Sequence, residues 1–138
     1  MKNIENIEKE ITELHQFFQS WYRGNIENSE RSFSRLADVL AAEFALITPD
    51  GHMVERDQLL DLMRAEYATK PEIKIWVENF RLRISDQNVF IVIYEEHGID
   101  KTREQVSLIT AVLRENQKQL NGLEWVHIGE VHIPSQET

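Results

Sequence analysis

The stretch that decides the fold is the last one, Leu123-Glu124-Trp125-Val126-His127-Ile128-Gly129-Glu130-Val131-His132-Ile133-Pro134. Apolar and polar residues alternate along much of it, which is typical of a half-buried strand. Successive side chains of a strand point to opposite faces, so Trp125 and His127 are expected on one face, and Glu130 and His132 on the other. This segment closes a chain whose first half has a helical pattern and whose second half is a run of long strands. That order predicts an α+β fold.

The first half of the chain predicts three helices, because its apolar residues recur at intervals of three and four. They are expected at Ile4–Trp21, directly after the cap Asn28-Ser29-Glu30, and at Arg56–Tyr67. Between the second and third helices, Phe44–Thr48 and His52–Val54 are expected to pair as a hairpin. The sequence Pro49-Asp50-Gly51 between them suits a tight turn, since proline presets one turn position and glycine accepts a positive φ.

In the second half the apolar period changes from helical to two. Long strands are expected at Ile73–Ser85, Val89–Glu96, Arg103–Arg114 and in the closing segment, with His97–Lys101 as a connection. β-Branched and aromatic residues dominate these segments, as they do in central strands. In the first of them, strict alternation places Ile75 and Val77 on one face, and Trp76, Phe80, Leu82 and Ile84 on the other.

Composition narrows the classes of function. A chain of 138 residues is expected to form one domain, residues 1–138. The formal net charge of −9 argues against a nucleic-acid partner and against an anionic membrane surface. There is no cysteine, so disulfides and thiolate chemistry are excluded. The N-terminus lacks a signal-peptide core and no apolar run has membrane-spanning length, so a cytoplasmic location is expected.

This order of elements resembles the nuclear-transport-factor-two-like superfamily, especially its SnoaL-like and ketosteroid-isomerase-like small proteins. The residues that carry the resemblance are the Ile4–Trp21 helix, the segment Phe44–Gly51, the helix around Leu59-Leu60, and Trp125 with His127 after Gly122. The resemblance implies a cone-shaped α+β fold, in which a curved, mixed, mostly antiparallel sheet wraps around three N-terminal helices. It also implies a cavity at the wide end of the cone and a homodimer formed through the outer face of the sheet.

The candidate catalytic residues are His127 and Tyr94. Histidine is the side chain most easily used as a proton shuttle near neutrality, and Trp125 would stand beside His127 as an aromatic wall. Tyr94 could polarise a carbonyl, as the tyrosine of a ketosteroid isomerase does. Gly129 removes a polar partner on the His127 face. The alternative is that these side chains are structural.

Further residues are candidates for ligand binding: Trp21, Trp76, Phe80, Arg83 and Trp125. The aromatic members could line a cavity or simply belong to the core. Arg83 could bind a carboxylate together with Arg81, or pair with glutamates across the sheet.

Neither a metal site nor a cofactor is predicted. Histidine and carboxylate suit zinc or iron, but alternation separates Glu96 from His97, and it likewise separates His127 from His132. Asp50 is explained by the geometry of its turn. No phosphate loop or nucleophile motif is present.

Three functions fit these observations. The first is a protein that binds a small apolar or amphipathic molecule in a cavity. The second is a small isomerase, cyclase or dehydratase that uses His127 as acid and base, with Tyr94 or Arg83 polarising a carbonyl. The third is a module whose sheet face holds a partner protein. The first is preferred, because the sequence supplies a plausible pocket but no catalytic pair.

Overall fold

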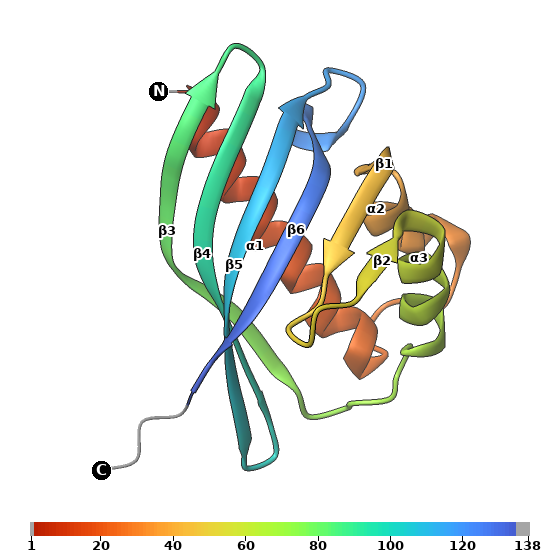
Figure 1. Ribbon diagram of the computed structural model, residues 1–138. Helices are drawn as coiled ribbons and strands as arrows, with labels where there is room; N and C mark the ends of the chain where they lie inside the picture. Colours follow the sequence, from red (N-terminus) through yellow and green to blue (C-terminus); the bar gives the residue numbers. More distant parts are fainter. Residues whose placement is uncertain (1, 135–138) are drawn as a thin grey trace.

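The computed structural model describes residues 2–134 of the chain (Figure 1). Its helices and strands are α1 (Lys2–Arg23), α2 (Glu30–Ala37), β1 (Leu40–Ile47), β2 (Met53–Glu55), α3 (Arg56–Ala65), β3 (Lys74–Asp86), β4 (Val89–Asp100), β5 (Arg103–Glu115), a short 3-10 helix η1 (Leu120–Gly122) and β6 (Leu123–Ile133).

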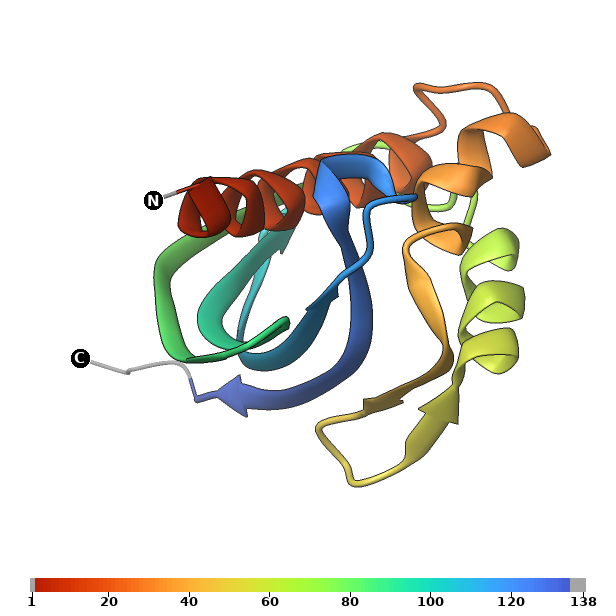
Figure 2. The ribbon, with the colours of Figure 1, turned by 90° about the horizontal axis from the view of Figure 1, so that it is seen from above.

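The strands form a six-stranded sheet in the order β2-β1-β6-β5-β4-β3. Every neighbouring pair is antiparallel except β1 and β6, which run parallel. The long strands β3 to β6 curve around α1 (Figure 2), while α2 and α3 lie beside β1 and β2. The structure therefore confirms the predicted α+β fold with a curved, mostly antiparallel sheet. We call the face toward α1 the inner face and the opposite face the outer face.

The core lies between α1 and the inner face. The buried stripe of α1 repeats at helical spacing, and alternate residues of the strands meet it. The largest fully buried side chains are Trp21, Trp125, Tyr94, Phe33, Phe44 and Phe90. Helix α1 ends at Arg23, two residues beyond the expected Trp21, and the chain turns at Gly24, which has a φ of +74° and where a Cβ would lie 2.7 Å from the Cβ of Ala68. Ser29 caps α2 by accepting a hydrogen bond from the backbone N–H of Ser32.

Three expected boundaries were clearly wrong. Strand β1 begins at Leu40, four residues before the expected Phe44. Strand β4 does not end at Glu96 but continues to Asp100, paired with both β3 and β5. The reversal occurs at Lys101, which adopts a φ of +61°. Helix α3 ends at Ala65, two residues before Tyr67. The glycine at position 98 had favoured a loop in the sequence. In the structure the end of β4 is stabilised as a strand because it is hydrogen-bonded to β3 on one side and to β5 on the other.

Trp76 does not share a face with Phe80 as expected, because β3 contains a bulge between them. The register with β4 shifts between Glu78 and Arg81, and Asn79 takes a φ of +56°. Val77 and Phe80 consequently both pack against the core, and Trp76 is 40% exposed. Strict alternation had placed Trp76 with Phe80, and it failed because a bulge inserts one unpaired residue.

A bulge in β6 overturns the shared face of Trp125 and His127. Trp125 pairs with Leu113 of β5, while His127 pairs with the preceding residue, Val112. Adjacent residues of β5 point to opposite faces, so their partners do too, and Val126 is the extra residue. Trp125 is fully buried on the inner face, and His127 points to the outer face.

Candidate functional site

The candidate site is a cavity of about 510 Å³ between α1 and the inner face of the sheet. Apolar walls come from α1, β1, α3 and the centre of the sheet, including Phe18, Leu46 and Ile109. Polar groups from α1 and from the ends of β4, β5 and β6 line the rest. The volume lies within the range of about 300–1,000 Å³ that is usual for small-molecule sites.

Helix α1 contributes a histidine whose orientation is fixed. His15 is 3% exposed, and its Nδ1 lies 2.8 Å from the backbone oxygen of Ile11. A carbonyl only accepts, so Nδ1 carries a proton. The other nitrogen, Nε2, lies 2.9 Å from Oε2 of Glu96. The rings of Phe18 and Tyr94 contact the imidazole in edge-on geometry, with centroids 5.3 and 5.4 Å away.

The pair formed by His15 and Glu96 keeps this carboxylate ionised. Burial alone would raise the pKa of Glu96, but the hydrogen bond and charge of His15, assisted by the charge of His132, lower it below its ordinary value. Glu96 therefore offers the cavity a hydrogen-bond acceptor in a defined position.

The pKa of Glu130 is shifted in the opposite direction from that of Glu96. It projects from β6 into the same cavity, two residues before His132. Burial and the negative charge of Glu96 raise the pKa of Glu130 to about 7, with a smaller opposing effect from His15. The cavity thus holds two carboxyl groups whose surroundings drive their pKa values apart, an arrangement common in acid–base sites.

Two tyrosines remain protonated in this environment. Burial, followed by the charges of Glu96 and Glu130, raises the pKa of Tyr94 well above its usual value. Burial also raises the pKa of Tyr22, whose hydroxyl lies 3.6 Å from the sulfur of Met63. Both lie along the cavity, where Tyr94 can donate a hydrogen bond to a ligand.

The structure brings only one of the seven predicted site residues to the lining of this cavity within residues 2–134, and that residue is Tyr94. Trp21 and Trp125 belong to the core, where their indole N–H groups donate to the oxygen of Met63 at 2.7 Å and to Glu10 at 2.9 Å. The others lie in three settings: Phe80 half-buried against the core, Trp76 and Arg83 exposed, and His127 on the outer face.

His15 and the roles of Glu96 and Glu130 were not predicted from the sequence. A signal for each was present. His15 occurs in the apolar stripe of α1, one residue after Leu14 and three before Phe18. Glu96 continues the inward phase of Tyr94, because side chains two apart share a face. Polar residues at positions where the period demands apolar ones are candidates for a site.

A second polar group that sequence reasoning missed is structural. Glu10 is fully buried, and its carboxylate accepts hydrogen bonds from Arg35 at 2.9 and 3.2 Å, Asn121 at 2.9 Å and Trp125 at 2.9 Å. These contacts join α1 to α2, to the loop before β6 and to β6 itself. A buried carboxylate is tolerated when it is paired and hydrogen-bonded in this way.

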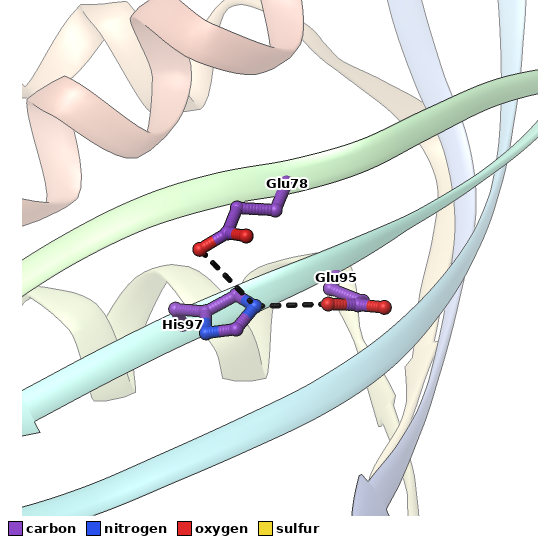
Figure 3. A group of neighbouring side chains, drawn as sticks. All are labelled: Glu78, Glu95 and His97. Carbon is purple, nitrogen blue, oxygen red and sulfur yellow. Dashed lines mark hydrogen bonds and ion pairs between the residues drawn. The ribbon is translucent and has the colours of Figure 1, made fainter.

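The residues best placed to hold a metal ion are on the outer face (Figure 3). The possible ligand atoms of Glu78, Glu95 and His97 lie within 4.8 Å of one another. His97 Nε2 is 2.9 Å from Glu95 and 3.7 Å from Glu78. The indole of Trp76 stacks on the imidazole at 5.3 Å and donates to Glu78 at 2.6 Å. These contacts explain the grouping without an ion, since His97 separates two carboxylates that pair directly across the strands.

The curved, mostly antiparallel sheet around α1 is the fold of α+β proteins of the nuclear-transport-factor-two-like type. An NTF-2-like protein of unknown function from Pseudomonas aeruginosa superposes with a TM-score of 0.82 at 22% identity, covering 97% of this chain and 100% of that one. The CaMKII hub of S. rosetta superposes with a TM-score of 0.73 at 10% identity, covering 94% and 95%. At these identities the likeness concerns the fold.

Within this class, the chain belongs to the family described as sucrose-6-phosphate phosphohydrolase C-terminal, whose family model matches residues 7–134. Sucrose-phosphatase 1 of Nicotiana tabacum is 24% identical over 127 residues, which cover 90% of this chain and 30% of the tobacco protein. The chain thus corresponds to less than a third of that relative's length. Across residues 2–134, helices fall short of the length and apolar character that membrane crossing demands.

Proposed function

We propose that this protein binds a small molecule in the cavity between α1 and the inner face of the sheet. The observation that carries the proposal is the convergence of Glu96, Glu130 and Tyr94 on one apolar-walled space. Convergent polar groups in an apolar cavity are the usual composition of a ligand site.

The expected ligand has an apolar body and a polar end. Phe18, Leu46 and Ile109 suit the body, because burying apolar surface stabilises the complex by about 25 cal/mol per Å². Glu96 accepts and Tyr94 donates a hydrogen bond at the polar end. The family and the tobacco relative are named for sucrose phosphate hydrolysis, but the match covers only 30% of that relative. Hydrolysis of a sugar phosphate is therefore not part of the proposal.

A second candidate function is acid–base catalysis in the same cavity. It rests on Glu130, whose pKa of about 7 lets it both take up and release a proton near neutral pH. Tyr94 would donate to a developing oxyanion. In this alternative Glu130 takes the acid–base role predicted for His127, which points to the outer face.

We also propose that two copies associate through the outer face. Val131 and Ile133 of β6 are 63% and 39% exposed there, beside the half-buried Val106 and Leu108 of β5. Apolar side chains gathered on one sheet face mark an interaction surface. The alternative, a different partner protein on this face, is distinguished by sedimentation of the purified protein: a dimer supports self-association, and a monomer at micromolar concentration contradicts it.

The test of ligand binding is native mass spectrometry of freshly purified protein and of two matched variants. Leu46→Trp fills the cavity from β1, whereas Leu62→Trp adds the same ring at a side chain that is 58% exposed on α3. A co-purified molecule should be retained by the wild type and by Leu62→Trp, and lost from Leu46→Trp. Retention of the same mass by Leu46→Trp would contradict binding in this cavity.

A further inference from the structure

Glu130 is a half-buried carboxylate of the cavity wall that lacks a side-chain partner among residues 2–134. Among residues 2–134, no side chain lies within hydrogen-bonding or ion-pairing distance of its carboxylate. Two other carboxylates at or next to the cavity have a cationic partner. His15 pairs with Glu96 at 2.9 Å and Lys70 pairs with Glu66 at 2.9 Å, while Asp100 and Arg103 are register partners at the end of the β4–β5 hairpin.

An ionised carboxylate without a partner in this half-buried position raises the free energy of the folded protein. Glu130 is only partly accessible, the wall around it is largely apolar, and the ionised Glu96 faces the same space. Desolvation and a like charge both disfavour its ionised form. The unfavourable energy is removed when a positive group occupies the space in front of the carboxylate, since an ion pair with hydrogen bonds offsets the loss of hydration.

The wall of the cavity already accepts an ammonium group at another point. Nζ of Lys70 lies 4.5 Å from the centroid of the Tyr22 ring and 2.9 Å from the carboxylate of Glu66. An aromatic face combined with a carboxylate is a favourable environment for such a cation. The rings of Phe18 and Tyr22 line the same cavity as Glu130, so aromatic faces and a carboxylate are also available to a cation inside it.

We propose that the cavity selects a protonated amine with an apolar body, and that the carboxylate of Glu130 binds its ammonium group. This inference rests on the proposed ligand-binding function and specifies its ligand class. The apolar body packs against Phe18, Leu46 and Ile109, and the ammonium donates to Glu130. A neutral alcohol can make only the uncharged part of this contact, and a carboxylate ligand is repelled by Glu96 and Glu130.

Binding of a protonated amine should release a proton from Glu130, whereas binding of a neutral ligand should not. Below neutral pH the protonated carboxyl group of Glu130 loses its proton to solvent as the ammonium binds, and the amine keeps its own. The titratable and charged groups that line the cavity with Glu130 are His15 and Tyr22 of α1, Lys70, Tyr94, Glu96, His97 and Asp100 of β4, Arg103 of β5, and His132 of β6. Because the pKa of Glu130 is about 7 in the free protein, nearly one proton should be released per amine bound at pH 6, and few at pH 8.

The experiment compares three probes of equal chain length, hexylamine, hexanol and hexanoate, by titration calorimetry. At pH 8, where Glu130 is already ionised, hexylamine should bind at least about tenfold more tightly than hexanol, since hydrogen bonds to charged groups contribute about 1.5–3 kcal/mol. Hexanoate should bind most weakly. Titrations at pH 6 in two buffers of different ionisation enthalpy measure the released proton.

Two variants test whether Glu130 is the residue responsible for the amine preference and the proton release. Glu130→Gln should remove the preference for the amine and the proton release, while Glu104→Gln, which makes the same change at an exposed glutamate of β5, should keep both. Thermal unfolding confirms that each variant is folded, and the buffer comparison on the wild type tests the inference without any variant. Equal binding of the amine and the alcohol would overturn the inference and leave the binding function standing. Absence of binding by all three probes would overturn the inference, and native mass spectrometry would then decide the binding function separately.

Discussion

Replacing Glu130 by glutamine should stabilise the protein at alkaline pH and have no effect in acid. In the folded protein the pKa of Glu130 is about 7, because of burial and the charge of Glu96, against an ordinary value of 4.5. Glutamine has nearly the same shape and no charge. The substitution therefore removes the electrostatic cost of Glu130 and little else.

The sign and the size of the effect follow from proton linkage. Between pH 4.5 and about 7 the folded state binds more protons at Glu130 than the unfolded state, so stability falls as pH rises through this window. The contribution of the protonated carboxyl is fully present below about pH 4.5 and is lost above about pH 7. At about 1.36 kcal/mol per pKa unit, the loss reaches at most about 3 kcal/mol by pH 8. Since part of Glu130 is accessible, we expect Glu130→Gln to stabilise by about 1–3 kcal/mol at pH 8.

Urea denaturation at pH 4.5 and pH 8 measures this difference. Wild type, Glu130→Gln and the exposed control Glu104→Gln are compared, and the control should follow the wild type at both pH values. In thermal unfolding the gain at pH 8 corresponds to roughly 3–12 °C for a chain of this size. A Glu130→Gln protein no more stable than wild type at pH 8, or equally stabilised at both pH values, would refute the reasoning. Stability gained by removing a charged group is typical of residues kept for function.

Three further predictions follow from other parts of the structure. Glu10→Gln should lower the free energy of unfolding in urea by about 3–5 kcal/mol, because it breaks a buried ion pair. Glu13→Gln on the same helix, where the side chain is 35% exposed, should lower it by less than about 1 kcal/mol. Equal losses would contradict the hydrogen-bond network assigned to Glu10. Tyr94→Phe should weaken binding of the co-purified ligand about three- to tenfold in calorimetry, because one hydrogen bond is lost. His127→Ala should leave binding unchanged, because His127 lies on the outer face. The reverse pattern would make His127 the site residue. Val131→Glu should convert a dimer into a monomer in sedimentation velocity, and an unaltered dimer would show that another surface holds the copies together.

Local patterns were sufficient for most of the fold. The helical period of α1, the serine cap of α2 and the proline-aspartate-glycine turn before β2 each depend on residues close in the chain. Their physical causes, namely side-chain spacing, satisfaction of free N–H groups and backbone preference, operate over a few residues. The order of these elements then limited the possible architectures.

The face assignments failed where the sheet bends. Sequence periodicity assumes a regular strand, but a sheet that curves around α1 requires local irregularities, and β3 and β6 supply them as bulges at Asn79 and Val126. Each bulge reverses the phase of the residues that follow it. Trp76 and His127, both predicted as candidates for the cavity wall, lie outside the cavity lining, Trp76 exposed and His127 on the outer face.

The sequence by itself determined the fold class, because helix and strand formation depend on patterns between neighbouring residues. It also determined the absence of thiol chemistry and the acidic charge. Only the tertiary structure decided the site. The pairing of His15 with Glu96, 81 positions apart, and the isolation of Glu130 depend on which side chains share a low-dielectric space. Such proximity is set by the curvature of the whole sheet around α1, and a charge acquires its unusual pKa only in that assembled environment.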